Sequence, residues 1–307
     1  MAESSHVTRR SLLKAACAVP FAAKMTDAFA QSDKPLLTRE IPHSGEKLPA
    51  VGLGTAVSFP AADQRQVAAL SDVVDALLAG GGKLVDTAST YGNAENVIGE
   101  IVSRTKARER LFLATKIEVR SAKDGADEFK RSLQRLRTPR VDLLQLHNVS
   151  RANQSLAQLR DWKSAGQCRY IGVTSTFQDD YAAMEAIIRR EKPDFVQVDY
   201  SMDNREAEKR IIPVAAEVGA AVLTALPLGR TSLFRAVKGK ALPPWAKDFD
   251  AETWAQFFLK FLLGNPHVTA VIPGTGNAQH MRDNVGAARG RVPDEPQRQK
   301  MLALLNS

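Results

Sequence analysis

The chain has 307 residues, of which 44% are hydrophobic and 25% are charged, a composition typical of a globular protein with a sizeable core. The net charge of +8 comes from 42 basic and 34 acidic residues spread along the chain, which argues against a nucleic-acid-binding protein. With two cysteines, Cys17 and Cys168, the chain cannot build a disulfide framework, and neither cysteine has the spacing of a metal site.

The first thirty residues have the pattern of an export signal. Arg9 and Arg10 precede the apolar stretch 15–23, and the triplet A-F-A at 28–30 follows it, which is the order of regions in a signal peptide. The arginine pair resembles the signal of the twin-arginine pathway. The apolar stretch is too short to cross a bilayer, which takes about twenty apolar residues.

We therefore expect residues 1–30 to be a signal peptide read by the twin-arginine export machinery. Residues 31–307 would be a soluble domain that is periplasmic or otherwise exported after cleavage. The alternative is that the apolar stretch forms an amphipathic first helix of the fold.

A short hairpin is predicted before the main part of the chain. The turn sequence H-S-G-E at 43–46 lies between two short extended runs within residues 36–48. Such a hairpin could close the N-terminal end of a barrel.

From about residue 50, short β-branched runs alternate with longer amphipathic segments, which is the pattern of parallel strands joined by helices. The strand candidates are 50–53, 83–86, 111–115, 141–146, 170–173, 195–198, 221–224 and 268–272. The helix candidates are 64–79, 94–104, 126–136, 155–165, 180–190, 206–218, 251–263 and 278–288. Eight such pairs, with no G-x-G-x-x-G after the first strand, favour a (β/α)8 TIM barrel over a doubly wound sheet.

One connection in this pattern is unusually long. Residues 226–250, after the seventh strand, contain Gly229, Gly239 and five basic residues, and loops of this length are usually functional or mobile. Their position places them at the catalytic face of a barrel. The tail 291–307 carries no recognisable pattern.

Four reactive side chains follow the ends of neighbouring strands. Asp86 ends the second strand, Tyr91 lies five residues later, Lys116 ends the third strand and His147 ends the fourth. Each alone has an ordinary structural explanation, but polar residues at strand ends of a barrel converge at one mouth. A tyrosine hydroxyl is a weak acid at neutral pH. A neighbouring ammonium group favours the phenolate, a carboxylate would orient that ammonium, and a histidine could place a substrate oxygen.

The motifs at these positions are specific as a set. They are I-P-H-S-G-E-K-L-P-A-V-G-L-G-T, V-D-T-A-S-T-Y-G-N-A-E, A-T-K, L-L-Q-L-H-N, Y-I-G-V-T-S, V-Q-V-D-Y-S and V-I-P-G-T-G-N-A-Q-H-M-R-D-N. Over residues 36–288 the sequence resembles the aldo-keto reductases. The resemblance implies that Asp86, Tyr91, Lys116 and His147 are the catalytic four, with Tyr91 as the proton donor when a carbonyl is reduced. It also implies an NADPH cofactor bound across the barrel mouth without a Rossmann domain.

The resemblance further implies a set of cofactor positions. These are Gly54, Thr55, Thr174, Ser175, Gln197, Pro227, Leu228, Gly229, Pro273, Gly274, Thr275, His280, Asp283 and Asn284. Ala225 stands where the family often has an aromatic residue under the nicotinamide. Gly274 and His280 stand where it often has Lys and Arg for the 2′-phosphate, and Arg282 is a candidate substitute. The resemblance favours NADPH, and because of these departures NADH stays open.

The sequence thus predicts an exported oxidoreductase that reduces a small aldehyde or ketone by hydride transfer from NAD(P)H. One alternative is a regulatory or sensor protein that binds the nicotinamide cofactor with slow or no turnover. Another is a non-redox barrel enzyme such as an isomerase, which would need a metal site or phosphate-binding glycines.

Overall fold

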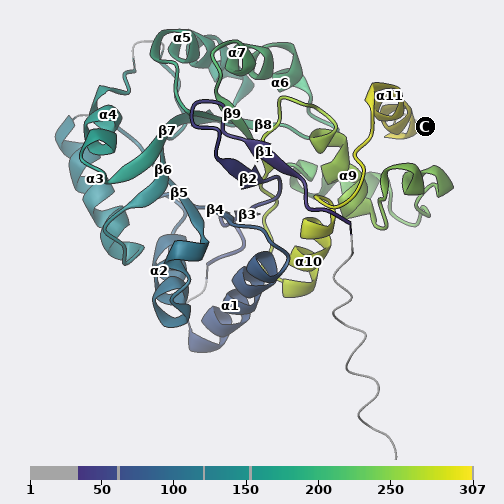
Figure 1. The fold of residues 1–307 in the computed structure, drawn as a ribbon, viewed down its shortest axis with the longest axis horizontal. Helices are drawn as coiled ribbons and strands as arrows, with labels where there is room; N and C mark the ends of the chain where they lie inside the picture. The colour runs from purple at the N-terminus through teal and green to yellow at the C-terminus, as the bar shows by residue number, and fades with distance from the viewer. Residues whose placement is uncertain (1–33, 61–62, 120–121, 152–153, 306–307) are drawn as a thin grey trace, which may run out of the picture. The chain divides into compact units, whose positions relative to one another are not determined.

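The structure is a computed structural model that describes residues 34–60, 63–119, 122–151 and 154–305 (Figure 1). The predicted signal peptide at residues 1–30 lies outside the described residues. Among the residues that are described, no helix combines the length and the hydrophobicity of a transmembrane span.

Eight parallel strands follow one another in chain order to form the central sheet. They are β3 (Leu53–Gly54), β4 (Leu84–Asp86), β5 (Phe112–Ile117), β6 (Val141–Leu146), β7 (Cys168–Ser175), β8 (Phe195–Asp199), β9 (Ala221–Ala225) and β10 (Ala270–Val271). Bridges between the first and last of these strands, Val51 to Val271 and Gly54 to Gly274, close the sheet. The predicted (β/α)8 barrel is therefore confirmed, and every predicted strand overlaps an observed one.

Helices surround the strands in Figure 1. They are α1 (Gln64–Ala79), α2 (Ala94–Thr105), α3 (Ala122–Arg135), α4 (Ala157–Ser164), α5 (Tyr181–Glu191), α6 (Glu206–Lys209), α7 (Ile211–Glu217), α8 (Ser232–Ala236), α9 (Trp254–Leu263), α10 (Ala278–Gly286) and α11 (Glu295–Leu305). The strands read as nearly continuous apolar runs because one face meets these helices and the other face fills the barrel. The inward side chains near the N-terminal end, including Phe112, Tyr170 and Phe195, form their own apolar cluster.

The predicted helix 206–218 is wrong as a single element. The structure breaks it at Arg210, whose φ of −138° and ψ of −58° are not helical, so that α6 and α7 are separate. Pro213 explains the break, because a proline lacks the amide donor and its ring clashes with the carbonyl four residues earlier. In the first turn of a new helix a proline meets neither difficulty.

Two regions without a predicted element contain helices. The long connection 226–250 holds α8 and two 3-10 turns, and the tail 291–307 holds α11. α11 packs against the barrel through Arg298, which is only 7% exposed. Arg298 donates to the carbonyl of Phe261 at 3.1 Å and to the hydroxyl of Tyr200 at 2.9 Å. An arginine at the buried position hides the apolar periodicity on which sequence prediction depends.

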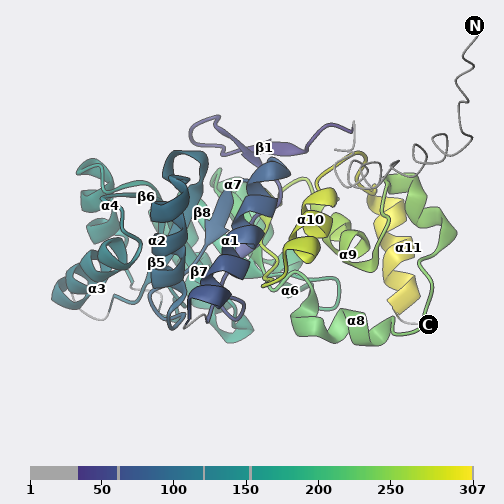
Figure 2. The same ribbon diagram turned by 90° about the horizontal axis from the view of Figure 1, so that it is seen from below.

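The predicted N-terminal hairpin is confirmed as β1 (Thr38–Glu40) paired antiparallel with β2 (Lys47–Pro49). Figure 2 shows the hairpin on one side of the barrel and α8 on the opposite side. Leu48 and the neighbouring Ile41 are buried in the inner cluster, so the hairpin closes the N-terminal end of the barrel. The opposite end is the one where the strands terminate and the long connection begins.

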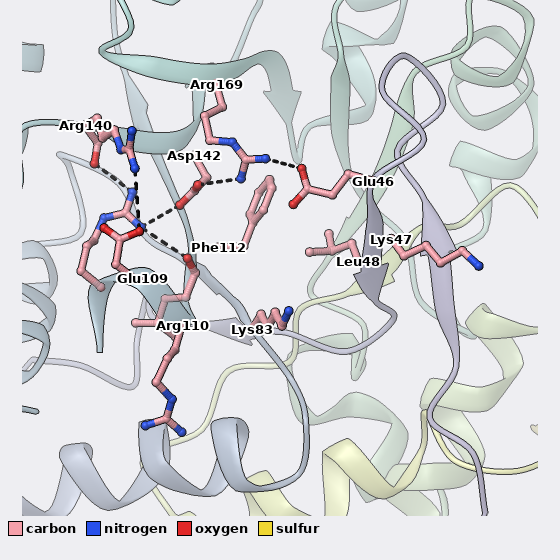
Figure 3. Close-up of a pocket in the computed structure, with 12 residues that line it drawn as sticks. Glu46, Lys47, Leu48, Lys83, Glu109, Arg110, Phe112, Arg140, Asp142 and Arg169 are labelled. Atoms are coloured by element: carbon pink, nitrogen blue, oxygen red, sulfur yellow. Dashed lines mark hydrogen bonds and ion pairs between the residues drawn. The ribbon is translucent and has the colours of Figure 1, made fainter. Parts of the chain in front are cut away.

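A cavity of about 410 Å³ lies at this closed end, between the hairpin and the first residues of β5, β6 and β7. Charged side chains line most of it. Figure 3 shows the guanidinium group of Arg169 between the carboxylates of Asp142 and Glu46. Residues at the N-terminal face of such a barrel usually contribute to its stability rather than to catalysis.

Asp142 connects three strands at this end, and its replacement tests that role. The carboxylate accepts from the amide of Leu113 at 2.8 Å and lies 3.0 Å from both Arg108 and Arg169. We expect Asp142→Asn to lower the free energy of unfolding by about 2 kcal/mol, because two guanidinium groups lose their shared counter-ion. Urea unfolding measures the change, with the exposed Asp161→Asn as the control. Equal midpoints for the two variants would contradict the assignment.

Candidate active site

The four reactive side chains singled out from the sequence lie at the open end of the barrel. Asp86 is the last residue of β4, Lys116 is near the end of β5, and His147 directly follows β6. Side chains alternate along a strand, so Asp86 and Lys116 point inward like Leu84 of the inner cluster. Tyr91 lies in the turn between β4 and α2.

Asp86 and Lys116 form a buried ion pair. The Lys116 ammonium donates to Oδ2 of Asp86 at 2.6 Å and to the carbonyl of Thr87 at 2.9 Å, and both side chains are almost inaccessible. Burial raises the pKa of Asp86, opposed by the charge of Lys116. Burial also disfavours the charged form of Lys116, but Asp86 and Tyr91 outweigh it and leave the Lys116 pKa raised. The ammonium form of Lys116 is thus held beside Tyr91.

Tyr91 is half-buried, like His147 and unlike the buried Asp86 and Lys116. Its ring centroid lies 5.0 Å from the Lys116 nitrogen, and its ring meets that of His147 edge-on with centroids 5.6 Å apart. The turn that places it is fixed by a hydrogen bond from the Tyr91 backbone N–H to the carbonyl of Ala88 at 3.1 Å and by Gly92, whose φ of 58° favours glycine. The phenol therefore stands between an ammonium group and an imidazole at the barrel mouth.

His147 is a neutral imidazole in this setting. Burial lowers its pKa to about 3, and the charge of Lys116 acts in the same direction. Its Nδ1 lies 3.2 Å from the hydroxyl of Thr90. If that hydroxyl donates, the ring proton is on Nε2, which makes His147 a hydrogen-bond donor.

We expect the His147 ring to stay neutral across physiological pH. Because its pKa is lowered, the ring takes up a proton only as the pH falls to about 3. NMR titration of the ring signals between about pH 5 and 8 is expected to show no step for His147. In Lys116→Met its pKa is expected to rise but not to reach the ordinary value, because burial is the larger cause. A midpoint near 6.5 in the unaltered protein would contradict this account.

Gln197, one of the predicted cofactor positions, lies beside the ion pair and brings with it a residue that the sequence analysis missed. The Gln197 amide nitrogen donates to Oδ2 of Asp86 at 3.3 Å, and its oxygen accepts from Gln145 at 2.7 Å. Both amides are buried. Gln145 stands two residues before His147, on the inward face of β6, and that spacing was the available signal.

Four further predicted cofactor positions, Gly54, Thr55, Pro273 and Gly274, lie where β3 and β10 meet. A Cβ atom added to Gly54 would lie 2.9 Å from the carbonyl oxygen of Ile272, and one added to Gly274 would lie 3.2 Å from the oxygen of Gly54. The Thr55 hydroxyl donates to the carbonyl of Asp86 at 3.0 Å, which places it beside the ion pair. The Gly54 amide donates to the carbonyl of Pro273 at 3.1 Å.

The two predicted positions on β7 differ in their surroundings. Thr174 pairs in register with Gln197 and is buried on the inward face. Ser175 points to the other face, where its hydroxyl donates to Asp180 at 2.6 Å and accepts from the amide of Phe177. Its side chain is therefore engaged in the loop after β7.

The remaining predicted positions lie on α10 and on the long connection. Asp283 accepts from Thr253 and from Gln256, each at 2.8 Å, so it links α10 to α9. Thr275 lies in the turn before α10, His280 is exposed and Asn284 is buried. In the long connection Pro227 is buried and Leu228 is half-buried. Gly229 has a φ of 58°, and a Cβ there would lie 2.5 Å from Asp203.

Within the described ranges, no three His, Cys, Asp or Glu side chains are grouped as a metal site requires. The features that the structure does assemble are a closed parallel barrel, a buried Lys–Asp pair at its open end, and a tyrosine and a histidine above that pair. Together they define a parallel barrel protein with a cluster of titratable side chains at its mouth.

The chain belongs to the aldo/keto reductase family, whose model matches residues 50–299. It is 30% identical to an uncharacterized oxidoreductase of Schizosaccharomyces pombe over 69% of this chain and 71% of that protein. Among solved structures, a thermostable aldo-keto reductase in complex with the inhibitor epalrestat is 26% identical, with a TM-score of 0.71 over 88% of this chain and 100% of the other. An aldo-keto reductase from Klebsiella pneumoniae in complex with NADPH is 21% identical, with a TM-score of 0.70 over 87% and 94%.

Proposed function

We propose that this protein reduces an aldehyde or ketone by hydride transfer from NADPH or NADH, with Tyr91 as the general acid. The observation that carries the proposal is the position of the Tyr91 ring, 5.0 Å from a Lys116 ammonium that Asp86 holds at 2.6 Å. The chain's membership of the family and its structural likeness to a reductase whose structure contains NADPH support the same proposal.

Several groups at the barrel mouth support binding of a nicotinamide cofactor there. Gly54 and Gly274 approach each other so closely that a Cβ atom on Gly54 would meet the carbonyl oxygen of Ile272 at 2.9 Å. One N–H of Gln197 faces Asp86, and its second N–H is available to a carboxamide oxygen. Thr174 beside it adds a hydroxyl. When bound there, the reduced nicotinamide supplies the hydride.

The protein's own groups supply the proton and hold the substrate oxygen. Lys116, fixed by Asp86 and the Thr87 carbonyl, stabilises negative charge on the Tyr91 oxygen, so the phenol can donate its proton as charge develops on the substrate oxygen. The neutral His147 ring donates a hydrogen bond to the same oxygen and orients it. Tyr91 is half-buried, so solvent can return the proton after turnover.

Cofactor binding and turnover test this proposal. Titrating the protein with NADPH and with NADH, followed by quenching of its tryptophan fluorescence, is expected to give a Kd in the micromolar range for at least one of them. A panel of small aldehydes and ketones is then expected to oxidise the bound cofactor. Binding without turnover across the panel would favour a sensor protein instead. The absence of binding by either cofactor would refute the proposal.

A further inference from the structure

Two buried amides form a chain that ends on the ion pair. Gln145 on β6 donates to the side-chain oxygen of Gln197 on β8 at 2.7 Å, and Gln197 donates to Oδ2 of Asp86 at 3.3 Å. The same Asp86 oxygen accepts from Lys116 at 2.6 Å. The chain therefore runs from Gln145 across the barrel to the group that holds Lys116 beside Tyr91.

The direction of this chain is fixed by its charged end. Asp86 presents acceptor oxygens to its neighbours, so Gln197 must turn its NH2 group toward Asp86 and its oxygen away. That oxygen then requires a donor, and the NH2 group of Gln145 supplies it. A rotated Gln197 amide would place two acceptor oxygens against each other in a buried site, which is costly.

The barrel makes room for this contact at one glycine. β7 lies between β6 and β8, and Gly172 is the register partner of Gln145. A Cβ atom at Gly172 would lie 3.0 Å from Cγ of Gln145 and 2.9 Å from the carbonyl oxygen of Phe195. Because Gly172 has no side chain, Gln145 reaches across β7 to Gln197. The contact joins two strands that are not adjacent, because β7 lies between them. It therefore depends on how closely β6 and β8 approach each other across β7.

We propose that Gln145 is a positioning residue, which orients the Gln197 amide so that one N–H supports Asp86 and the second faces the cofactor. The proposal rests on the proposed carbonyl reduction and deepens it. Gln145 itself reaches neither the substrate nor the cofactor in this role. Without it, the Gln197 amide is free to rotate, Asp86 loses a hydrogen bond, and the cofactor loses an oriented donor.

A double-mutant cycle separates this role from simple core packing. Gln145→Met, Gln197→Met and the double variant are compared with the unaltered protein for NADPH Kd and for kcat. We expect each single variant to lower both the affinity for NADPH and kcat by about tenfold, because each removes one oriented hydrogen bond. In the Gln197→Met background, Gln145→Met is expected to have almost no further effect. Thr224→Val is the control, because its hydroxyl is buried on a barrel strand without a partner among the described residues.

The possible outcomes are distinct. If the two substitutions reduce kcat and affinity multiplicatively, Gln145 acts by packing and the proposed role is refuted. If the unaltered protein shows neither cofactor binding nor turnover, the proposed function fails first and the positioning role fails with it.

A second variant covers the case in which Gln145→Met does not fold. Gln145→Glu keeps the shape of the side chain and donates to Gln197 only when protonated, within reach of the charges of Asp86 and Lys116. The kcat of this variant relative to the unaltered protein is expected to fall as the pH rises. A ratio that does not depend on pH would overturn the proposal.

Discussion

Tyr91→Phe is expected to reduce carbonyl reduction to a small residual rate while leaving cofactor binding nearly unchanged. The substitution removes one oxygen atom and keeps the ring that packs edge-on against His147. Without the phenol, no proton donor stands beside Lys116, and loss of a general acid lowers kcat by about a thousandfold. The measurement is steady-state kcat at saturating NADPH, combined with the NADPH Kd from fluorescence quenching.

Tyr170→Phe is the matched control for that substitution. Tyr170 lies at the closed end of the same barrel, where its hydroxyl hydrogen-bonds to Ser44 and to Glu46 at 2.6 Å. Losing this hydroxyl is expected to lower the free energy of unfolding by about 1 kcal/mol and to leave kcat unchanged. If Tyr91→Phe retained turnover close to that of Tyr170→Phe, another group would have to be the acid.

Lys116→Met is expected to have the second largest effect, because it removes activity and stability together. The buried carboxylate of Asp86 loses the ammonium group 2.6 Å away, and breaking a buried pair on one side costs about 3–5 kcal/mol. The Tyr91 phenol also loses the ammonium group beside it, 5.0 Å from its ring centroid, which stabilises the charge left when the proton is donated, so kcat is expected to fall by about a hundredfold or more. Urea unfolding and steady-state kinetics measure the two effects.

Lys260→Met controls for the loss of a buried lysine elsewhere. Lys260 on α9 is inaccessible and donates to the carbonyl oxygens of Arg289 at 2.7 Å and Arg291 at 2.8 Å. Its replacement is expected to lower stability without lowering kcat under conditions where the protein is folded. A similar loss of kcat in both lysine variants would mean that destabilisation alone explains the effect of Lys116→Met.

Much of the barrel could be predicted from the sequence because its signals are local. The strand 141–146 and the helix 64–79 were predicted with the boundaries that the structure has for β6 and α1. Asp86, Lys116 and His147 could be placed at one mouth because parallel strands of a barrel end on the same side. The ion pair then follows from two inward positions on adjacent strands.

The features that could not be predicted depend on contacts between distant parts of the chain. α11 is held by Arg298, whose partners Phe261 and Tyr200 lie far back in the sequence. The contact of Gln145 with Gln197 requires the spacing of three strands and the open space at Gly172. The break between α6 and α7 is different, because Pro213 was a local signal that the amphipathic pattern outweighed.

The most direct test of the account follows the hydride and the proton in one reaction. The protein is incubated with an aldehyde from the active panel and with NADPH that carries deuterium at both positions of the reactive nicotinamide carbon, and the alcohol is analysed by mass spectrometry. We predict deuterium on the carbinol carbon of the alcohol made by the unaltered protein, and about a thousandfold less alcohol over the same time from Tyr91→Phe with the cofactor still bound. Alcohol without deuterium, or equal alcohol from both proteins, would contradict hydride transfer with Tyr91 as the acid.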